Sequence, residues 1–125
     1  MYHVAVIRDF IARHYLIGGD WGSENQEHAH HYRVEVELYG QSLNEHQYLV
    51  DIVAIEDHLG ELIAYYRDRV LNELPEFTGV NPSLETFARI LCQSFDHAIQ
   101  DENVTGITVR LWENENAWAG FSMER

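Results

Sequence analysis

The sequence contains no lysine, and its eight arginines stand against 21 acidic residues. The formal net charge of −13 at pH 7 would repel a polyphosphate backbone, so we expect no nucleic-acid binding. A single cysteine, Cys92, excludes an internal disulfide and is typical of a reducing compartment. No apolar run approaches the roughly 20 residues that span a bilayer, and no charged leader precedes a long apolar stretch. We therefore expect a cytoplasmic protein without a membrane segment or a signal peptide.

The most informative stretch lies at residues 28–38, where polar and apolar side chains alternate. Period two predicts a β-strand with one buried face, and His28 and His30 share that face with Tyr32. Side chains two positions apart on a strand point the same way, with backbones about 7 Å apart. This spacing suits two imidazole ligands of one zinc ion, which then needs a third ligand from elsewhere. The alternative is the polar start of a strand that holds no metal.

His14 is the candidate for that third ligand. Residues 2–17 predict another strand, in which His14 shares a largely apolar face with Phe10 and Ala12. If the two strands pair antiparallel, His14 lies near His28, and three histidines with an open fourth position are the layout of a catalytic zinc site. The alternative is a core histidine with a hydrogen-bond partner.

Two helices and two further strands follow. The segment 52–70 repeats apolar residues at three- and four-residue steps, which predicts an amphipathic helix with His58 at the border of its apolar stripe. A second helix has Asn81 as its expected N-cap, Pro82 at its first position, Glu85 in its first turn and Cys92 beside its buried stripe. The remaining elements are a loop at 18–27, a turn at 41–47, a connector at 71–80 and a hairpin of strands at 104–113 and 117–123.

The predicted order β-β-α-α-β-β indicates an α+β fold, with a four-stranded antiparallel sheet and both helices on one face. The length of 125 residues suits a single domain that spans residues 1–125. Such a sheet leaves two strand edges open, and edge-to-edge pairing of copies into a ring would close both. The topology therefore predicts a homo-oligomer.

Six short motifs fall in order along the chain: Phe10-x-Ala12-x-His14-x-Leu16, His28-Ala29-His30-His31-Tyr32, Leu49-Val50-Asp51, Leu71-Asn72, Asn81-Pro82-Ser83-Leu84-Glu85 and Trp112-Glu113. In these motifs the chain resembles the 6-pyruvoyltetrahydropterin synthase family, which includes the 6-carboxytetrahydropterin synthases. The resemblance covers nearly the whole chain. It implies the tunnelling fold, whose subunits form trimeric barrels that stack into hexamers, and a small-molecule pterin as substrate.

The resemblance also assigns roles to individual residues. His14, His28 and His30 match the family's zinc ligands. Glu113 matches the glutamate that holds the pterin ring, and a carboxylate can accept two hydrogen bonds from an amino-pyrimidinone edge. Glu85 matches another family glutamate, although a structural role in capping its helix is the alternative.

The chain departs from the family pattern at the catalytic residues. Glu24 stands where the family has its catalytic cysteine, four residues before His28. Arg67 and Asp68 stand where the family has an Asp-His pair. The proton relay made of cysteine, aspartate and histidine is therefore absent, and Asp57-His58 could replace the pair only with a shift of the helix register.

Some family members carry glutamate in place of the cysteine and cleave a different side-chain bond of 7,8-dihydroneopterin triphosphate. The resemblance thus implies a zinc-dependent, lyase-like enzyme in which Glu24 removes a proton and Asp68 assists. Arg67 is a candidate to meet a phosphate or carboxylate of the substrate. Two alternatives remain open: a pterin- or purine-binding homologue without catalysis, and an assembly protein whose histidines hold a metal for stability alone.

Overall fold

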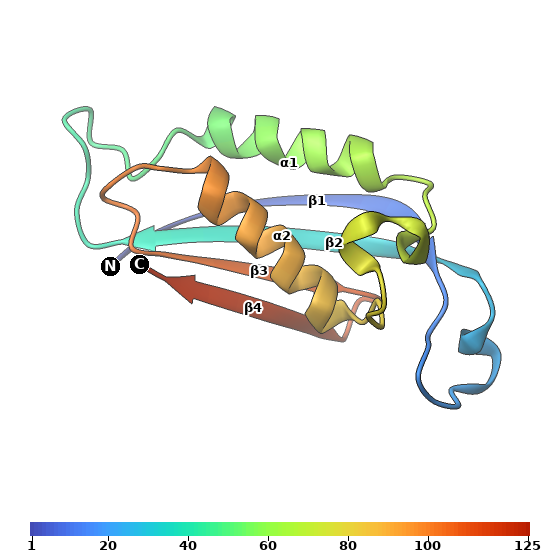
Figure 1. The fold of residues 1–125 in the computed structure, drawn as a ribbon. Coiled ribbons are helices and arrows are strands. Elements are labelled where there is room, and N and C mark those ends of the chain that lie inside the picture. Colours follow the sequence, from blue (N-terminus) through green and yellow to red (C-terminus); the bar gives the residue numbers. More distant parts are fainter.

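The computed structural model describes all residues from 1 to 125 (Figure 1). Its main elements follow the predicted order: β1 (Tyr2–His14), β2 (His28–Gly40), α1 (Ile52–Tyr66), α2 (Leu84–Ala98), β3 (Gly106–Trp112) and β4 (Trp118–Glu124). Three short 3₁₀ helices lie in the connections, at Gly22–Asn25, Leu71–Glu73 and Pro75–Phe77. None of the helices is long and apolar enough to cross a membrane.

The four strands form one antiparallel sheet in the order β1-β2-β3-β4. The pair β1–β2 is the longest, and it runs from Tyr2 opposite Gly40 to His14 opposite His28. Figure 1 shows α1 and α2 on the same face of this sheet, with both chain termini at the end opposite the loop between β1 and β2. The predicted α+β architecture is confirmed.

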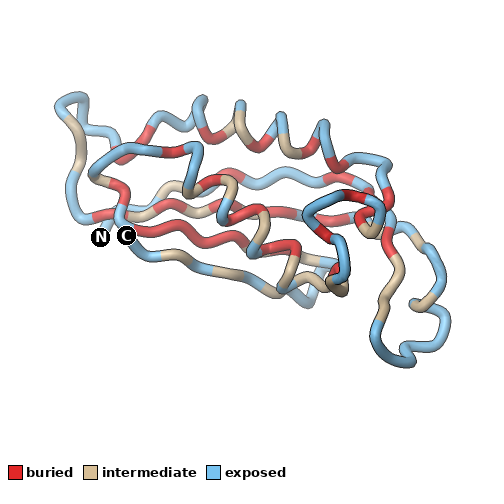
Figure 2. Tube along the Cα trace, viewed as in Figure 1, coloured by how far each residue is buried: buried red, intermediate tan, exposed pale blue.

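The core lies between this sheet face and the two helices, where buried positions alternate along the strands (Figure 2). At its centre is Phe87 of α2, which is fully buried. Its ring centroid lies 4.9 Å from that of Tyr66 and 5.4 Å from that of Tyr32. Phe10 and Phe77 complete the cluster, with centroids at 6.0 and 5.6 Å from Phe87. These rings bind α2 to β1 and β2 beside the histidine end of the sheet.

The helix-free face of the sheet combines ion pairs with exposed apolar side chains, among them Ile7, Ile11 and Trp118. Arg110 pairs with Glu35 at 2.9 Å and with Glu37 at 3.6 Å across β2 and β3. Tyr39 covers Gly106 so closely that a Cβ there would lie 2.1 Å from the tyrosine ring, so this position requires glycine. Cross-strand pairs of this kind stabilise a sheet whose second face lacks a helical layer.

The first helix is shorter than predicted. It ends at Tyr66 instead of Val70, because the chain turns at Asp68 (φ 62°) and runs along the outer edge of β1. There the Asp68 N–H donates to the Ile11 carbonyl and the Arg13 N–H to the Arg69 carbonyl, each at 2.8 Å. These long-range bonds replace the last helical turn and close one end of the β1 edge.

The second helix begins later than predicted, and its N-cap is Ser83. The Ser83 hydroxyl accepts the Thr86 N–H at 3.1 Å, as an N-cap should. Asn81, the predicted cap, instead uses its amide oxygen to accept the Ile17 N–H at 2.9 Å. That bond lies beyond the end of β1, which stops at His14 and not at Ile17.

Replacing Phe87 with alanine should destabilise the fold by about 3–5 kcal/mol, because it removes the buried ring at the centre of the aromatic cluster. Chemical denaturation measures this loss as a lower midpoint. Tyr48 is 63% exposed, and Tyr48→Ala is the matched control, with an expected change within about 0.5 kcal/mol. Equal losses in the two variants would contradict the described core.

Candidate metal centre

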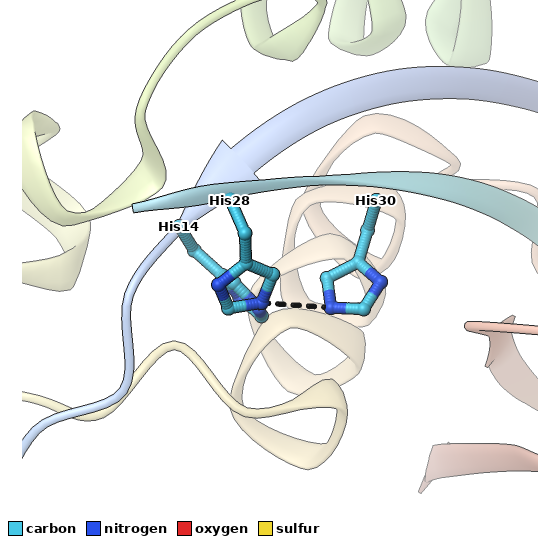
Figure 3. A group of neighbouring side chains, drawn as sticks. All are labelled: His14, His28 and His30. Carbon is cyan, nitrogen blue, oxygen red and sulfur yellow. Dashed lines mark hydrogen bonds between the residues drawn. The ribbon is translucent and has the colours of Figure 1, made fainter. Parts of the chain in front are cut away.

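Three histidine rings meet at the ends of β1 and β2. The Nε2 atoms of His14 and His28 lie 3.0 Å apart, and those of His28 and His30 also lie 3.0 Å apart. Each ring offers a nitrogen, and the three nitrogens all lie within 4.8 Å of one another. Figure 3 shows the rings converging from the two strands. The period-two pattern and the register of β1 against β2 produce this convergence, as the sequence predicted.

Hydrogen bonds on the far side of two rings fix which nitrogen carries the proton. His14 Nδ1 lies 3.0 Å from the carbonyl oxygen of Pro82, and His28 Nδ1 lies 2.8 Å from that of Gln26. A carbonyl oxygen only accepts, so both Nδ1 atoms carry hydrogen and both Nε2 atoms of the neutral rings have bare lone pairs. Two such acceptors at 3.0 Å repel unless a cation lies between them. The donor set therefore fits a metal ion.

The electrostatic setting favours the neutral form of the His14 and His30 rings, which is the state that binds a metal. Burial, together with the neighbouring His30 and His28, lowers the pKa of His14 to about 4. Burial also lowers the pKa of His30, while the Glu113 and Glu24 carboxylates act in the opposite direction. Both rings are thus deprotonated on one nitrogen at neutral pH.

Buried groups around His14 hold its ring in place. The Tyr32 hydroxyl lies 3.2 Å from His14 Nδ1, on the same side as the Pro82 carbonyl. Burial, with a contribution from Glu113, raises the pKa of Tyr32, so its hydroxyl keeps its proton. The Pro82 carbonyl precedes α2, so the start of this helix is tied to the histidine cluster. A sequence carries no signal for such a backbone partner.

Three asparagine side chains shape the loops beside the cluster. Asn72 bonds both the N–H and the carbonyl of Tyr15, each at 2.9 Å, and Asn81 accepts from Ile17. Asn25 donates to the carbonyls of Leu16 and Gly19. Asn72 and Asn81 belong to the sequence motifs, but only the structure gives them this role.

Glu24 lies at the rim of the cluster, on the 3₁₀ helix Gly22–Asn25. Its Oε1 atom lies 4.0 Å from His28 Nε2, and its side chain is 49% exposed. The Glu24 carbonyl accepts the Leu16 N–H at 2.9 Å, which fixes the main chain at this point. The structure thus brings the predicted base next to the predicted metal ligands.

Glu113 directly follows β3 and lies on the histidine side of the sheet end. Its negative charge opposes the lowering of the pKa of His30 and contributes to the raised pKa of Tyr32, so it acts on the cluster electrostatically. It also lines a hollow of about 260 Å³ whose other lining residues include Asp9, His31 and Arg33 of the opposite sheet face. Glu85 lies exposed in the first turn of α2, where its negative charge interacts favourably with the helix dipole.

Arg67 and Asp68 do not join the histidine cluster within this chain. Both are exposed at the outer edge of β1, where the Asp68 carbonyl accepts from Arg13 at 3.2 Å. Their charges do not contribute to the pKa shifts of His14 or His30. Any role for them in catalysis would need a second copy of the chain at this edge.

Other reactive side chains also lie apart from the cluster. His31 pairs with Asp9 at 3.0 Å on the opposite sheet face. His58 joins the two helices through Ser94 at 2.9 Å. Cys92 is fully buried, and burial raises the pKa of its thiol to about 11, which suits the packing role expected from the sequence.

Comparison with known proteins finds a matching protein family. A family model described as 6-pyruvoyl tetrahydropterin synthase matches residues 3–124. No curated protein sequence matches the chain significantly.

Solved structures share the fold. The 6-pyruvoyl tetrahydropterin synthase of Caenorhabditis elegans superposes with a TM-score of 0.80 at 16% identity, over 99% of this chain and 95% of that one. The Plasmodium vivax enzyme gives a TM-score of 0.79 at 12% identity, with both chains fully covered. Two variants of the latter, in which a catalytic glutamate is replaced by cysteine or alanine, give 0.77 at 12% identity, again with both chains fully covered.

Replacing His30 with alanine should abolish tight zinc binding, because two imidazoles cannot enclose the ion as three can. Calorimetric titration of the metal-free protein measures the affinity. His31→Ala is the matched control, since His31 neighbours His30 in sequence but points to the other face. Equal affinities in the two variants would contradict the site.

Proposed function

Because the chain belongs to the 6-pyruvoyl tetrahydropterin synthase family, we propose that it is a zinc-dependent, lyase-type enzyme that acts on a reduced pterin. The observation that supports it is the convergence of three imidazole nitrogens close to the carboxylate of Glu24 and within the electrostatic influence of Glu113. Family and fold support a pterin-processing lyase. The choice of zinc, of 7,8-dihydroneopterin triphosphate as substrate and of the individual residue roles is our proposal.

Zinc is the proposed ion because three neutral histidines with a further position open are the donor set of catalytic zinc sites. His14, His28 and His30 would hold it through their Nε2 atoms. When bound, zinc would polarise an oxygen of the substrate side chain.

Glu113 is proposed to hold the pterin ring. Its carboxylate can accept two hydrogen bonds from the amino-pyrimidinone edge, a pairing that a neutral side chain cannot match. The charge of Glu113 acts on the pKa of His30, which supports placing the pterin ring beside the histidine cluster. Glu85, on the exposed first turn of α2, is a second candidate for substrate contact.

Glu24 is proposed as the general base. It is the acidic side chain closest to a histidine nitrogen of the cluster, and a carboxylate so placed can take the proton of a side-chain hydroxyl. The adjacent carbon–carbon bond would then break to leave an aldehyde, its electron pair would pass into the C=N bond of the dihydropterin ring, and the resulting anion would take up the proton from Glu24 to give the neutral product. The catalytic glutamate of the Plasmodium vivax enzyme supports this choice of residue type.

We further propose a homo-oligomer, with copies joined edge to edge into a trimer or a hexamer of two trimers. The β4 edge is open, and the β1 edge is open except near Arg13, where the chain after α1 covers it. Arg67 and Asp68 lie at that covered end and would reach a site only across a subunit boundary. In such an assembly Asp68 would assist proton transfer and Arg67 would meet a phosphate of the substrate.

Incubation of the zinc-loaded protein with 7,8-dihydroneopterin triphosphate should yield a pterin with a shortened side chain, identified by mass. Glu24→Gln should lower kcat by roughly 10²–10⁴-fold, because general base catalysis is lost, while substrate still binds. Glu113→Gln should raise KM instead.

Glu27→Gln is the matched control, since Glu27 pairs with Arg13 at 3.2 Å outside the cluster and the turnover should persist. Tight pterin binding without turnover would favour a binding protein of the same family. The absence of the family's catalytic cysteine and Asp-His pair is consistent with this alternative. Neither binding nor turnover would refute the pterin proposal.

A further inference from the structure

The carboxylate of Glu24 is close enough to His28 to suggest a second role. Two donor atoms on one tetrahedral zinc ion lie about 3.4 Å apart, given bonds of about 2.0–2.1 Å. Glu24 Oε1 lies 4.0 Å from His28 Nε2. The carboxylate lies outside the set of nitrogens that are all within 4.8 Å of one another, so a rotation of the Glu24 side chain has to bring it to ligand distance of the ion.

The turn that carries Glu24 is fixed, but its carboxylate is free. The Glu24 carbonyl accepts from Leu16 and its N–H donates to Trp21, while the Asn25 amide ties the same turn to Leu16 and Gly19. The Glu24 side chain itself makes no hydrogen bond. Because the main chain is anchored and the carboxylate makes no hydrogen bond, the Glu24 side chain can rotate without a loss of hydrogen bonds.

Competing acidic side chains are less well placed. Glu113 influences His30, but its oxygens lie beyond 4.0 Å of the histidine nitrogens. Glu27 is engaged by Arg13. Glu24 is therefore the only acidic side chain within 4.0 Å of a cluster nitrogen.

We propose that Glu24 is a displaceable fourth ligand of the metal ion. Without substrate its carboxylate completes the coordination and retains the ion. An incoming substrate displaces the carboxylate, and Glu24 is then free to accept a proton. This inference rests on the metal site of the proposed function. It adds a resting state in which the Glu24 carboxylate is bound to the metal ion and cannot accept a proton.

Zinc affinity in the absence of substrate tests the inference, measured by competition with a chromophoric chelator. Glu24→Gln should weaken zinc binding by about 10–100-fold, the range found when a group that supports a metal site is removed. Glu27→Gln should leave the affinity unchanged, and Glu113→Gln should weaken it less than Glu24→Gln does. Cobalt(II) in the wild-type site should also show a visible spectrum that Glu24→Gln alters, and pterin should shift the wild-type spectrum toward that of the variant.

Glu24→Asp separates ligation from a field effect of the negative charge. The shorter side chain keeps the charge but loses about 1.5 Å of reach, so ligation requires weaker zinc binding in this variant too. Wild-type affinity in Glu24→Asp with a loss in Glu24→Gln would overturn the inference, as would unchanged affinity in both or a loss confined to Glu113→Gln. Any of these results would overturn the ligand role of Glu24 alone and would not refute the proposed function. Weak zinc binding by the wild-type protein would instead refute the metal site of the proposed function.

Discussion

The antiparallel register of β1 against β2 is the constraint on which the site depends. It places His14 directly opposite His28, with His30 two positions further on the same face. A slip of one residue would turn every side chain of one strand to the other face, and buried Val6, Phe10 and Ala12 would enter water. The packing of the core thus enforces the geometry of the histidines.

Backbone and side-chain groups around the three histidines orient their rings as metal ligands. Backbone carbonyls of Pro82 and Gln26 take the Nδ1 protons of His14 and His28, so the Nε2 lone pairs face one another. Loops far apart in sequence meet here, held by the side chains of Asn72 and Asn81. Because Pro82 leads into α2 and Phe87 anchors α2 to the sheet, the hydrophobic core and the polar site stabilise each other.

Much of the fold follows from local pattern. Period two gave both strands of the first hairpin and put His14, His28 and His30 on one buried face, because side-chain alternation depends only on the neighbouring residues. The end of α1 could not be read this way, since residues 68–70 leave the helix to bond a strand some 55 positions away. The N-cap of α2 failed for the same reason: Asn81 serves Ile17, which is distant in sequence, and leaves the cap to Ser83.

The candidate site, like the fold, was predictable only in part. The histidine cluster follows from alternation, whereas the positions of Glu24 and Glu113 followed only from the family resemblance. The distance of Glu24 from His28 is set by the turn that Asn25 holds, and Arg67 and Asp68 lie at an edge that no local pattern locates. Such features depend on contacts between residues distant in sequence, and these contacts leave no local pattern in a single sequence.

X-ray absorption at the zinc edge of the zinc-loaded protein tests the central claim most directly. The account predicts three imidazole nitrogens at about 2.0–2.1 Å, with the outer-shell scattering of histidine rings. A spectrum without imidazole scattering, or with the six oxygen neighbours of hydrated zinc, would contradict it.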